Sequence, residues 1–178
     1  MPEQALSARL MLDAMAEFDR VVAALPAPGR GGPIGRLNAG AYTLMHVAFT
    51  SDYLLRFTTK SELDPFIQVN AGPGADPAKP PPFAEALTAL DAVNTRLRAY
   101  LEGVDAAENA RQPEGLPGFY GGATVEYIIA SAAAHTLVHA GELATLASLV
   151  GAPDLQLPGA MPHTRGEGGP SQPAEGTG

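Results

Sequence analysis

The distribution of glycine and proline constrains the fold of this chain more than any other feature of its sequence. The chain has 20 Gly and 17 Pro, and both residue types are unfavourable inside helices. All of them except Pro2 and Gly141 lie in residues 26–40, 65–82, 103–122 and 151–178. The remaining segments are each long enough for about five or more helical turns. They are residues 3–25, 41–64, 83–102 and 123–150.

Apolar residues recur in these segments at the three- and four-residue steps of amphipathic helices. No segment keeps the two-residue alternation of a strand for more than a few residues. We expect Asn38 to cap the second helix and Thr124 to cap the fourth. The expected inward stripes of the first two helices are Leu6, Leu10, Ala14, Phe18, Val21, Val22 and Leu25, followed by Tyr42, Met45, Phe49, Tyr53 and Phe57.

These patterns predict an all-α domain, a four-helix bundle covering residues 1–161. The connector at residues 58–82 is too long for a tight helix hairpin. It is able to cross the length of a bundle, so the second and third helices need not be antiparallel neighbours. Residues 162–178 have few apolar side chains, and we expect them to form a disordered tail whose removal leaves folding unchanged.

Charge and composition exclude several classes of protein. The chain has 11 Lys and Arg against 19 Asp and Glu, so a nucleic acid partner is not expected. It has no Cys, which leaves His, Asp and Glu to hold any metal. The N-terminus lacks the pattern of a signal peptide, and the apolar stretch at residues 125–150 carries a polar stripe. We therefore expect a cytoplasmic protein without a membrane span.

Three of the four histidines fall on predicted helices. His135 and His139 are one helical turn apart, so both imidazoles can reach the same ion. His46 lies on the predicted inward face of the second helix. The spacing is also compatible with an exposed or hydrogen-bonded histidine pair and a solitary core histidine. Glu142 follows on nearly the same line as His135, and it is a candidate fourth ligand, a partner of a ligand, a general base, or a solvated carboxylate.

Two blocks of the sequence resemble the DinB-like family of four-helix bundles. They are residues 36–48, RLNAGAYTLMHVA, and residues 134–143, AHTLVHAGEL. The resemblance covers roughly residues 5–150 and implies an up-down-down-up topology. It also implies that His46, His135 and His139 bind one divalent metal ion at one end of the bundle. Tyr42 stands where many members of the family carry Trp. Relatives include bacillithiol transferases and mycothiol-dependent maleylpyruvate isomerase, which implies a low-molecular-weight thiol as a further cofactor.

Three functions are compatible with these observations. The first is a metal-dependent enzyme acting on a small molecule, as a thiol-dependent transferase or isomerase or as a hydrolase, because three protein ligands leave an open coordination position. The second is a metal-binding or stress-associated bundle without turnover, and the third is a helical interaction protein without metal. Imidazole ligands suit zinc or nickel, and also iron or copper. The candidate pocket residues are Tyr42, Thr50, Tyr53, Ser131 and Glu142.

The sequence leads to two further expectations. His163 lies in the predicted tail and should not be a ligand. The fourth helix is rich in small residues on several sides, which would permit close approach of a second copy and predicts a homodimer. High helix propensity is the competing explanation for these alanines. They are Ala130, Ala132, Ala133, Ala134, Ala140, Ala144 and Ala147.

Overall fold

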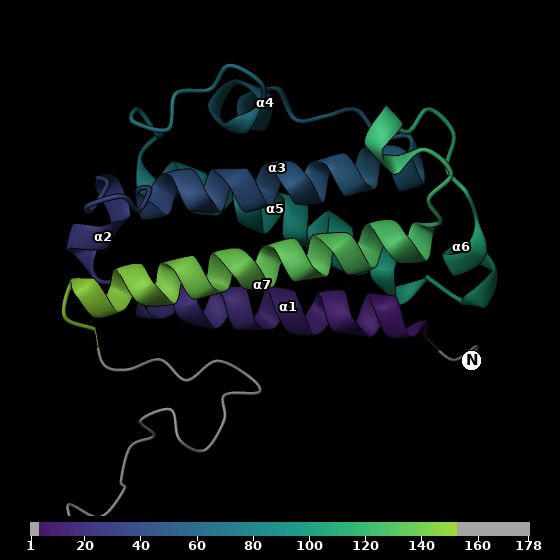
Figure 1. The fold of residues 1–178 in the computed structure, drawn as a ribbon, viewed down its shortest axis with the longest axis horizontal. Coiled ribbons are helices and arrows are strands. Elements are labelled where there is room, and N and C mark those ends of the chain that lie inside the picture. The colour runs from purple at the N-terminus through teal and green to yellow at the C-terminus, as the bar shows by residue number, and fades with distance from the viewer. Residues whose placement is uncertain (1–3, 153–178) are drawn as a thin grey trace, which may run out of the picture.

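The computed structural model describes residues 4–152, which form a bundle of long helices (Figure 1). The long helices are α1 (Leu6–Ala24), α3 (Gly40–Thr59), α5 (Phe83–Glu102) and α7 (Val125–Leu149). The only strand-like pairing within residues 4–152 is an isolated bridge between Ile34 and Leu37. The predicted all-α class is therefore confirmed. None of the helices in this part of the chain has an apolar stretch long enough to cross a lipid bilayer.

The connectors contain short helical segments that the sequence analysis did not predict. The longest of them, α4, begins at a proline and is capped by Asp64, whose carboxylate accepts hydrogen bonds from the amides of Phe66 and Ile67. The side chain of Ile67 is fully buried, so the connector packs on the bundle. The short segments are α2 (Ala27–Gly31), α4 (Pro65–Ala71), α6 (Ala106–Ala110) and a 3₁₀ turn (Gly118–Tyr120).

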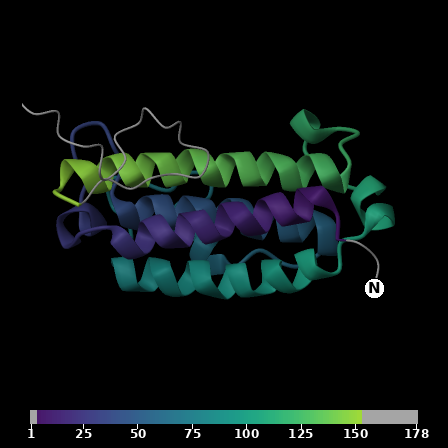
Figure 2. The ribbon, with the colours of Figure 1, turned by 90° about the horizontal axis from the view of Figure 1, so that it is seen from below.

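The four long helices pack as two pairs. The two helices within each pair run in the same direction, and the two pairs run in opposite directions. Figures 1 and 2 show α1 beside α7, both running the same way, and α3 and α5 running the other way. The amide of Ala5 donates to the carbonyl of Val104 at 3.1 Å, which places the start of α1 at the end of α5. The connector that contains α4 therefore crosses the bundle from the end of α3 to the start of α5 (Figure 1).

Several local expectations are wrong at the helix ends and on one face. Asn38 does not cap α3, which has Ala39 at the N-cap position without a side-chain hydrogen bond. The first residue of α3, Gly40, packs closely on another segment, since a Cβ there would lie 2.9 Å from the carbonyl oxygen of Gly29. Leu6 and Leu10 are 60% and 48% exposed, because the first turns of α1 bury the neighbouring face, including Ala8 and Met11.

Other expectations hold. The hydroxyl of Thr124 caps α7 by accepting a hydrogen bond from the amide of Tyr127 at 3.3 Å. The helix α5 starts directly after Pro82 and ends at Glu102, beside Gly103, as the flanking proline and glycine residues predict. The end of α3 is an exception, because the helix stops at Thr59, before the expected residue 64, and Lys60 adopts a left-handed conformation with φ of 61°.

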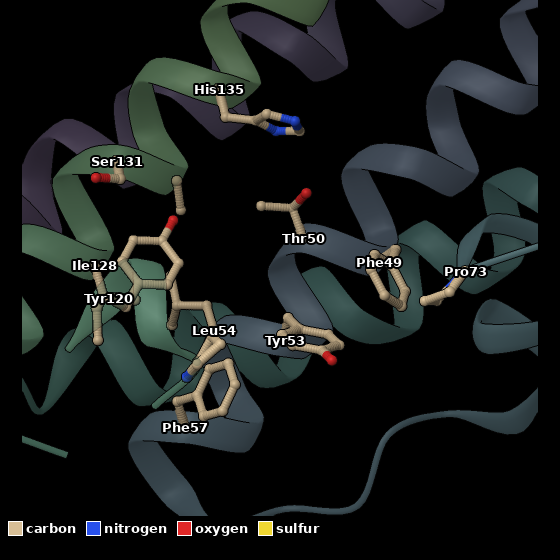
Figure 3. A pocket seen from close by; sticks show the side chains of 12 residues that line it. Phe49, Thr50, Tyr53, Leu54, Phe57, Pro73, Tyr120, Ile128, Ser131 and His135 are labelled. Atoms are coloured by element: carbon tan, nitrogen blue, oxygen red, sulfur yellow. The ribbon is translucent and has the colours of Figure 1, made fainter. Parts of the chain in front are cut away.

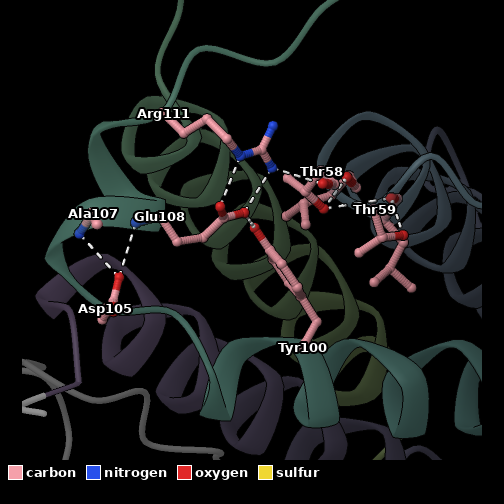
Figure 4. Close-up of polar contacts among 9 residues, drawn as sticks. Thr58, Thr59, Tyr100, Asp105, Ala107, Glu108 and Arg111 are labelled. Carbon is pink, nitrogen blue, oxygen red and sulfur yellow. Dashed lines mark hydrogen bonds and ion pairs between the residues drawn. The ribbon is translucent and has the colours of Figure 1, made fainter.

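A polar network holds the end of the bundle at which α7 begins (Figure 4). The guanidinium of Arg111 donates to the carboxylate of Glu108 and to the carbonyl of Thr58 at the end of α3. The hydroxyl of Tyr100 on α5 donates to the same carboxylate at 2.7 Å. The amide of Val125 donates to the carbonyl of Arg111 at 2.8 Å. Arg111 thus connects α3, α6 and the first residue of α7.

Candidate metal centre

The fold brings together the three histidines that the sequence singled out. His46 lies on α3, and His135 and His139 lie on the antiparallel neighbour α7. The Nε2 atom of His135 is 3.1 Å from Nε2 of His46 and 3.1 Å from Nε2 of His139. The ring centroids of the three pairs are 4.4–5.0 Å apart. Three imidazoles from two helices therefore direct the same ring nitrogen toward one point.

This spacing fits a single divalent ion. Two ligand atoms about 2.0–2.1 Å from a tetrahedral ion lie about 3.3 Å apart. The two Nε2 contacts of His135 are close to that value, and the potential ligand atoms of all three histidines lie within 4.8 Å of one another. Neutral imidazole nitrogens are ligands of the kind that zinc, nickel, iron and copper accept. The residues present thus fit a metal ion.

Glu142 contacts the histidine cluster through His139, on the side of that ring that faces away from the other two histidines. Its carboxylate lies 2.6 Å from Nδ1 of His139, the ring nitrogen that does not face the other histidines. A carboxylate accepts, so Nδ1 of His139 carries the proton and Nε2 presents its lone pair to the cluster. The Glu142 side chain is 44% exposed. Among the roles considered for Glu142, this geometry is that of a residue that orients a ligand.

Burial keeps the other two imidazoles neutral. Desolvation, reinforced by the nearby His139, lowers the pKa of His46. The same two effects, together with His46, lower the pKa of His135 to about 4. Neutral imidazoles are the form that binds metal. The Nδ1 atom of His135 is buried and has no hydrogen-bond partner among the described residues.

Comparison with known protein families agrees with this site. A family model of the DinB superfamily matches residues 13–143. The chain belongs to the DinB superfamily. The matched region contains His46, His135 and His139, so the whole cluster lies within the part shared with the superfamily. No curated protein shows significant similarity to the sequence.

In this DinB-superfamily protein, a pocket of about 380 Å³ opens beside the histidine cluster. His135 lies at one end of it, next to Thr50 (Figure 3). Its walls come from α3, from α7, from the connector between α4 and α5 and from the connector between α6 and α7. The lining residues are Phe49, Thr50, Tyr53, Leu54, Phe57, Pro73, Pro117, Tyr120, Ile128, Ser131, Ala132 and His135.

The five residues expected at the pocket divide into two groups. Thr50, Tyr53 and Ser131 line it, as expected. Tyr42 instead stacks on the ring of His46 at a centroid distance of 6.1 Å. Glu142 lies beside a separate small cavity of about 40 Å³. Tyr42 and Glu142 are therefore not among the residues that line the pocket beside the histidine cluster.

Sequence reasoning missed much of the pocket wall. Phe49 and Phe57 were assigned to a stripe facing the core, but both are only half-buried and line the pocket. Pro73 and Tyr120 come from connectors that no periodicity describes. His163 and the predicted tail lie outside the described residues.

Proposed function

We propose that this DinB-superfamily protein binds one divalent metal ion through Nε2 of His46, His135 and His139 and acts as a metal-dependent enzyme on a small molecule. The observation that carries the proposal is the convergence of these three nitrogens at 3.1 Å contacts. Zinc or nickel is the ion we favour, with iron or copper also compatible. The site would use a thiol cofactor in a transfer or isomerisation reaction, or water in a hydrolysis.

Each residue has a defined task in this proposal. His46 and His135 supply neutral ligand nitrogens from opposite helices, and the burial that lowers their pKa values keeps them unprotonated at neutral pH. Glu142 is a positioning residue, since its carboxylate accepts a hydrogen bond from Nδ1 of His139 and thereby fixes the direction of the ring. A bound divalent ion with an open position lowers the pKa of a thiol or a water and polarises a carbonyl.

A metal-binding bundle without turnover is the alternative function. The pocket beside the cluster favours an enzyme, because His135 belongs both to the pocket lining and to the ligand set. A molecule in the pocket would lie next to the ion. A site that only stores or senses metal has no need of such a space.

The first experiment measures metal in protein purified without a histidine tag, by elemental analysis. We expect about one divalent ion per chain and loss of most of it in His139→Ala, because two remaining ligands hold an ion weakly. The matched control is His163→Ala, which should keep the metal. Unchanged metal content in His139→Ala would contradict the ligand assignment.

A second measurement separates the enzyme from the alternative. The metal-loaded protein is assayed for transfer or isomerisation with bacillithiol or mycothiol, and for hydrolysis with ester and amide substrates. Turnover that disappears in His139→Ala supports the enzyme. Full metal content without turnover in any of these assays supports the bundle that only binds metal.

A further inference from the structure

The pocket beside the histidine cluster is lined by uncharged, mostly apolar side chains. Among its lining residues, none is Asp, Glu, Lys or Arg. Most of the wall consists of aromatic, proline and aliphatic side chains, with Thr50 and Ser131 as the small hydroxyl residues. The chain as a whole is acidic, so the uncharged character of this pocket is a local property.

Three aromatic rings of the pocket, those of Phe49, Tyr53 and Phe57, form a connected group on α3. Phe49 and Tyr53 have ring centroids 4.9 Å apart, and Tyr53 and Phe57 follow at 5.1 Å. Figure 3 shows Tyr53, Phe57 and Tyr120 farther from His135 than Thr50 is. An aromatic ring placed among these side chains would gain both apolar burial and edge contacts with them.

A charged group would be unfavourable in the same place. A carboxylate or an ammonium that leaves water needs an opposite charge or several hydrogen bonds in exchange. The lining offers no cationic or anionic side chain for this purpose. In the part of the pocket away from His135, the composition of the wall therefore disfavours a charged group.

We propose that this pocket binds an uncharged, predominantly aromatic group of the substrate and directs the reactive polar end of the molecule toward His135. The inference rests on the proposed function for the reaction, but the binding preference does not depend on it. A carboxylate or sugar of the reacting molecules would have to remain outside the part of the pocket formed by the aromatic side chains. The occupant is thus the apolar substrate rather than a polar thiol cofactor.

Two probes that share a naphthalene ring and differ in charge test this preference. 2-Naphthol is uncharged at neutral pH, and 2-naphthoate carries a carboxylate. Their fluorescence is measured in titrations with the metal-free protein, which avoids binding of the carboxylate to a metal ion. The chain contains no Trp, so protein fluorescence interferes little. We expect 2-naphthol to bind at least about tenfold more tightly than 2-naphthoate. Equal binding, tighter binding of 2-naphthoate, or no binding of either probe would overturn the proposal.

Substitutions at Ser131 locate the binding. Ser131 lines the pocket one helical turn before His135, and no part of the proposed metal site depends on its hydroxyl. Ser131→Phe should weaken 2-naphthol at least about tenfold by filling the space. Ser131→Lys should reverse the ranking of the probes, because the added cation compensates the carboxylate. A general loss of structure would weaken both probes and would not reverse their order.

Matched controls use the same helix. Ser148 is an exposed residue of α7 outside the pocket, and Ser148→Phe and Ser148→Lys should leave both affinities within about twofold of wild type. Thermal unfolding followed by circular dichroism checks that each variant is folded. If the Ser148 variants change probe binding as the Ser131 variants do, the probes bind elsewhere and the proposal is wrong.

Metal content, measured on the same preparations, separates the two proposals. Wild-type protein that binds 2-naphthol with the expected preference but holds no metal would refute the proposed function and leave the pocket assignment standing. Protein that holds the metal but binds neither probe would refute the pocket assignment alone.

Discussion

Glu142 touches the histidine cluster through one contact, the 2.6 Å hydrogen bond to Nδ1 of His139. Removing such a partner of a ligating histidine typically lowers metal affinity by about 10–100-fold. We expect that loss in Glu142→Ala, measured by competition with a chromophoric chelator, and partial recovery in Glu142→Gln, whose amide oxygen still accepts from Nδ1. The control is Glu126→Ala, an exposed carboxylate in the first turn of the same helix. Equal affinities of Glu142→Ala and wild type would show that the ring needs no such support.

The pH dependence of stability tests the burial of His135. In the folded metal-free protein its pKa is lowered from 6.5 to about 4, mainly by desolvation. Between these two values the unfolded chain binds the proton and the folded chain does not, so stability increases with pH in this window. The contribution of His135 is fully present above pH 6.5 and is lost as the pH falls toward about 4.

Urea unfolding of the metal-free protein at several pH values between 4 and 7 measures this effect. The decrease in unfolding free energy on acidification should be smaller in His135→Phe than in wild type, because the variant lacks the titrating group. His163→Ala should keep the wild-type slope. A His135→Phe variant with the same slope would show that its imidazole stays accessible to protons in the folded state.

At the scale of the elements, Arg111 connects α6, which has no buried residues, to α3 and to the start of α7. Its guanidinium donates to Glu108 and to the carbonyl of Thr58 (Figure 4), and its own carbonyl accepts from the first amide of α7. Arg111→Ala should lower the unfolding free energy by about 1–2 kcal/mol, a value reduced for the partial exposure of the pair. Arg9→Ala, at an exposed position on α1, serves as the control in urea unfolding. A loss no larger than that of the control would contradict the network's role.

The positions of the long helices could be predicted from the sequence because glycine and proline act locally. A proline before Phe83 and a glycine after Glu102 influence the backbone at those residues, whatever surrounds them. The predicted cap at Asn38 is wrong, since α3 begins one residue later than that cap requires, at Gly40, where the backbone lies close to Gly29 in a contact between segments that local sequence patterns do not report. The helix α4 was missed for a related reason, since its seven residues show less than two full periods of any pattern.

At the scale of the whole molecule, the metal site and the pocket differ in how far the sequence predicts them. The spacing of His135 and His139 specifies a shared face within one helix, and the DinB resemblance adds His46 from another. The pocket depends on where α3 and α7 meet the connectors, as the contributions of Pro73 and Tyr120 show. Periodicity identifies the apolar stripe of α3 but does not reveal which part of it remains uncovered after packing.

The alanine surface of α7 on which the homodimer was predicted is largely unavailable to a second copy. Four of its alanines, Ala132, Ala133, Ala140 and Ala147, are buried within the bundle and cannot contact a second copy. The outer side of α7 nevertheless exposes Leu137 and Val138, at 45% and 62%. The neighbouring α1 exposes Leu6 and Leu10. Exposed apolar side chains that gather into one patch are typical of an interface between subunits, and these four residues are the candidates for such a patch on α1 and α7.

We expect the protein to form a homodimer through exposed apolar side chains of α1 and α7. Light scattering coupled to size-exclusion chromatography, at micromolar concentration, should give twice the 18.3 kDa mass of one chain. Leu137→Glu should shift the protein to the monomer, because a charge buried against a second apolar surface finds no partner. Val69→Glu is the control, since Val69 is a large exposed residue on α4, which lies over α3 (Figure 1). A monomeric wild type would refute the dimer, and a dimer that persists in Leu137→Glu would place the interface on another face.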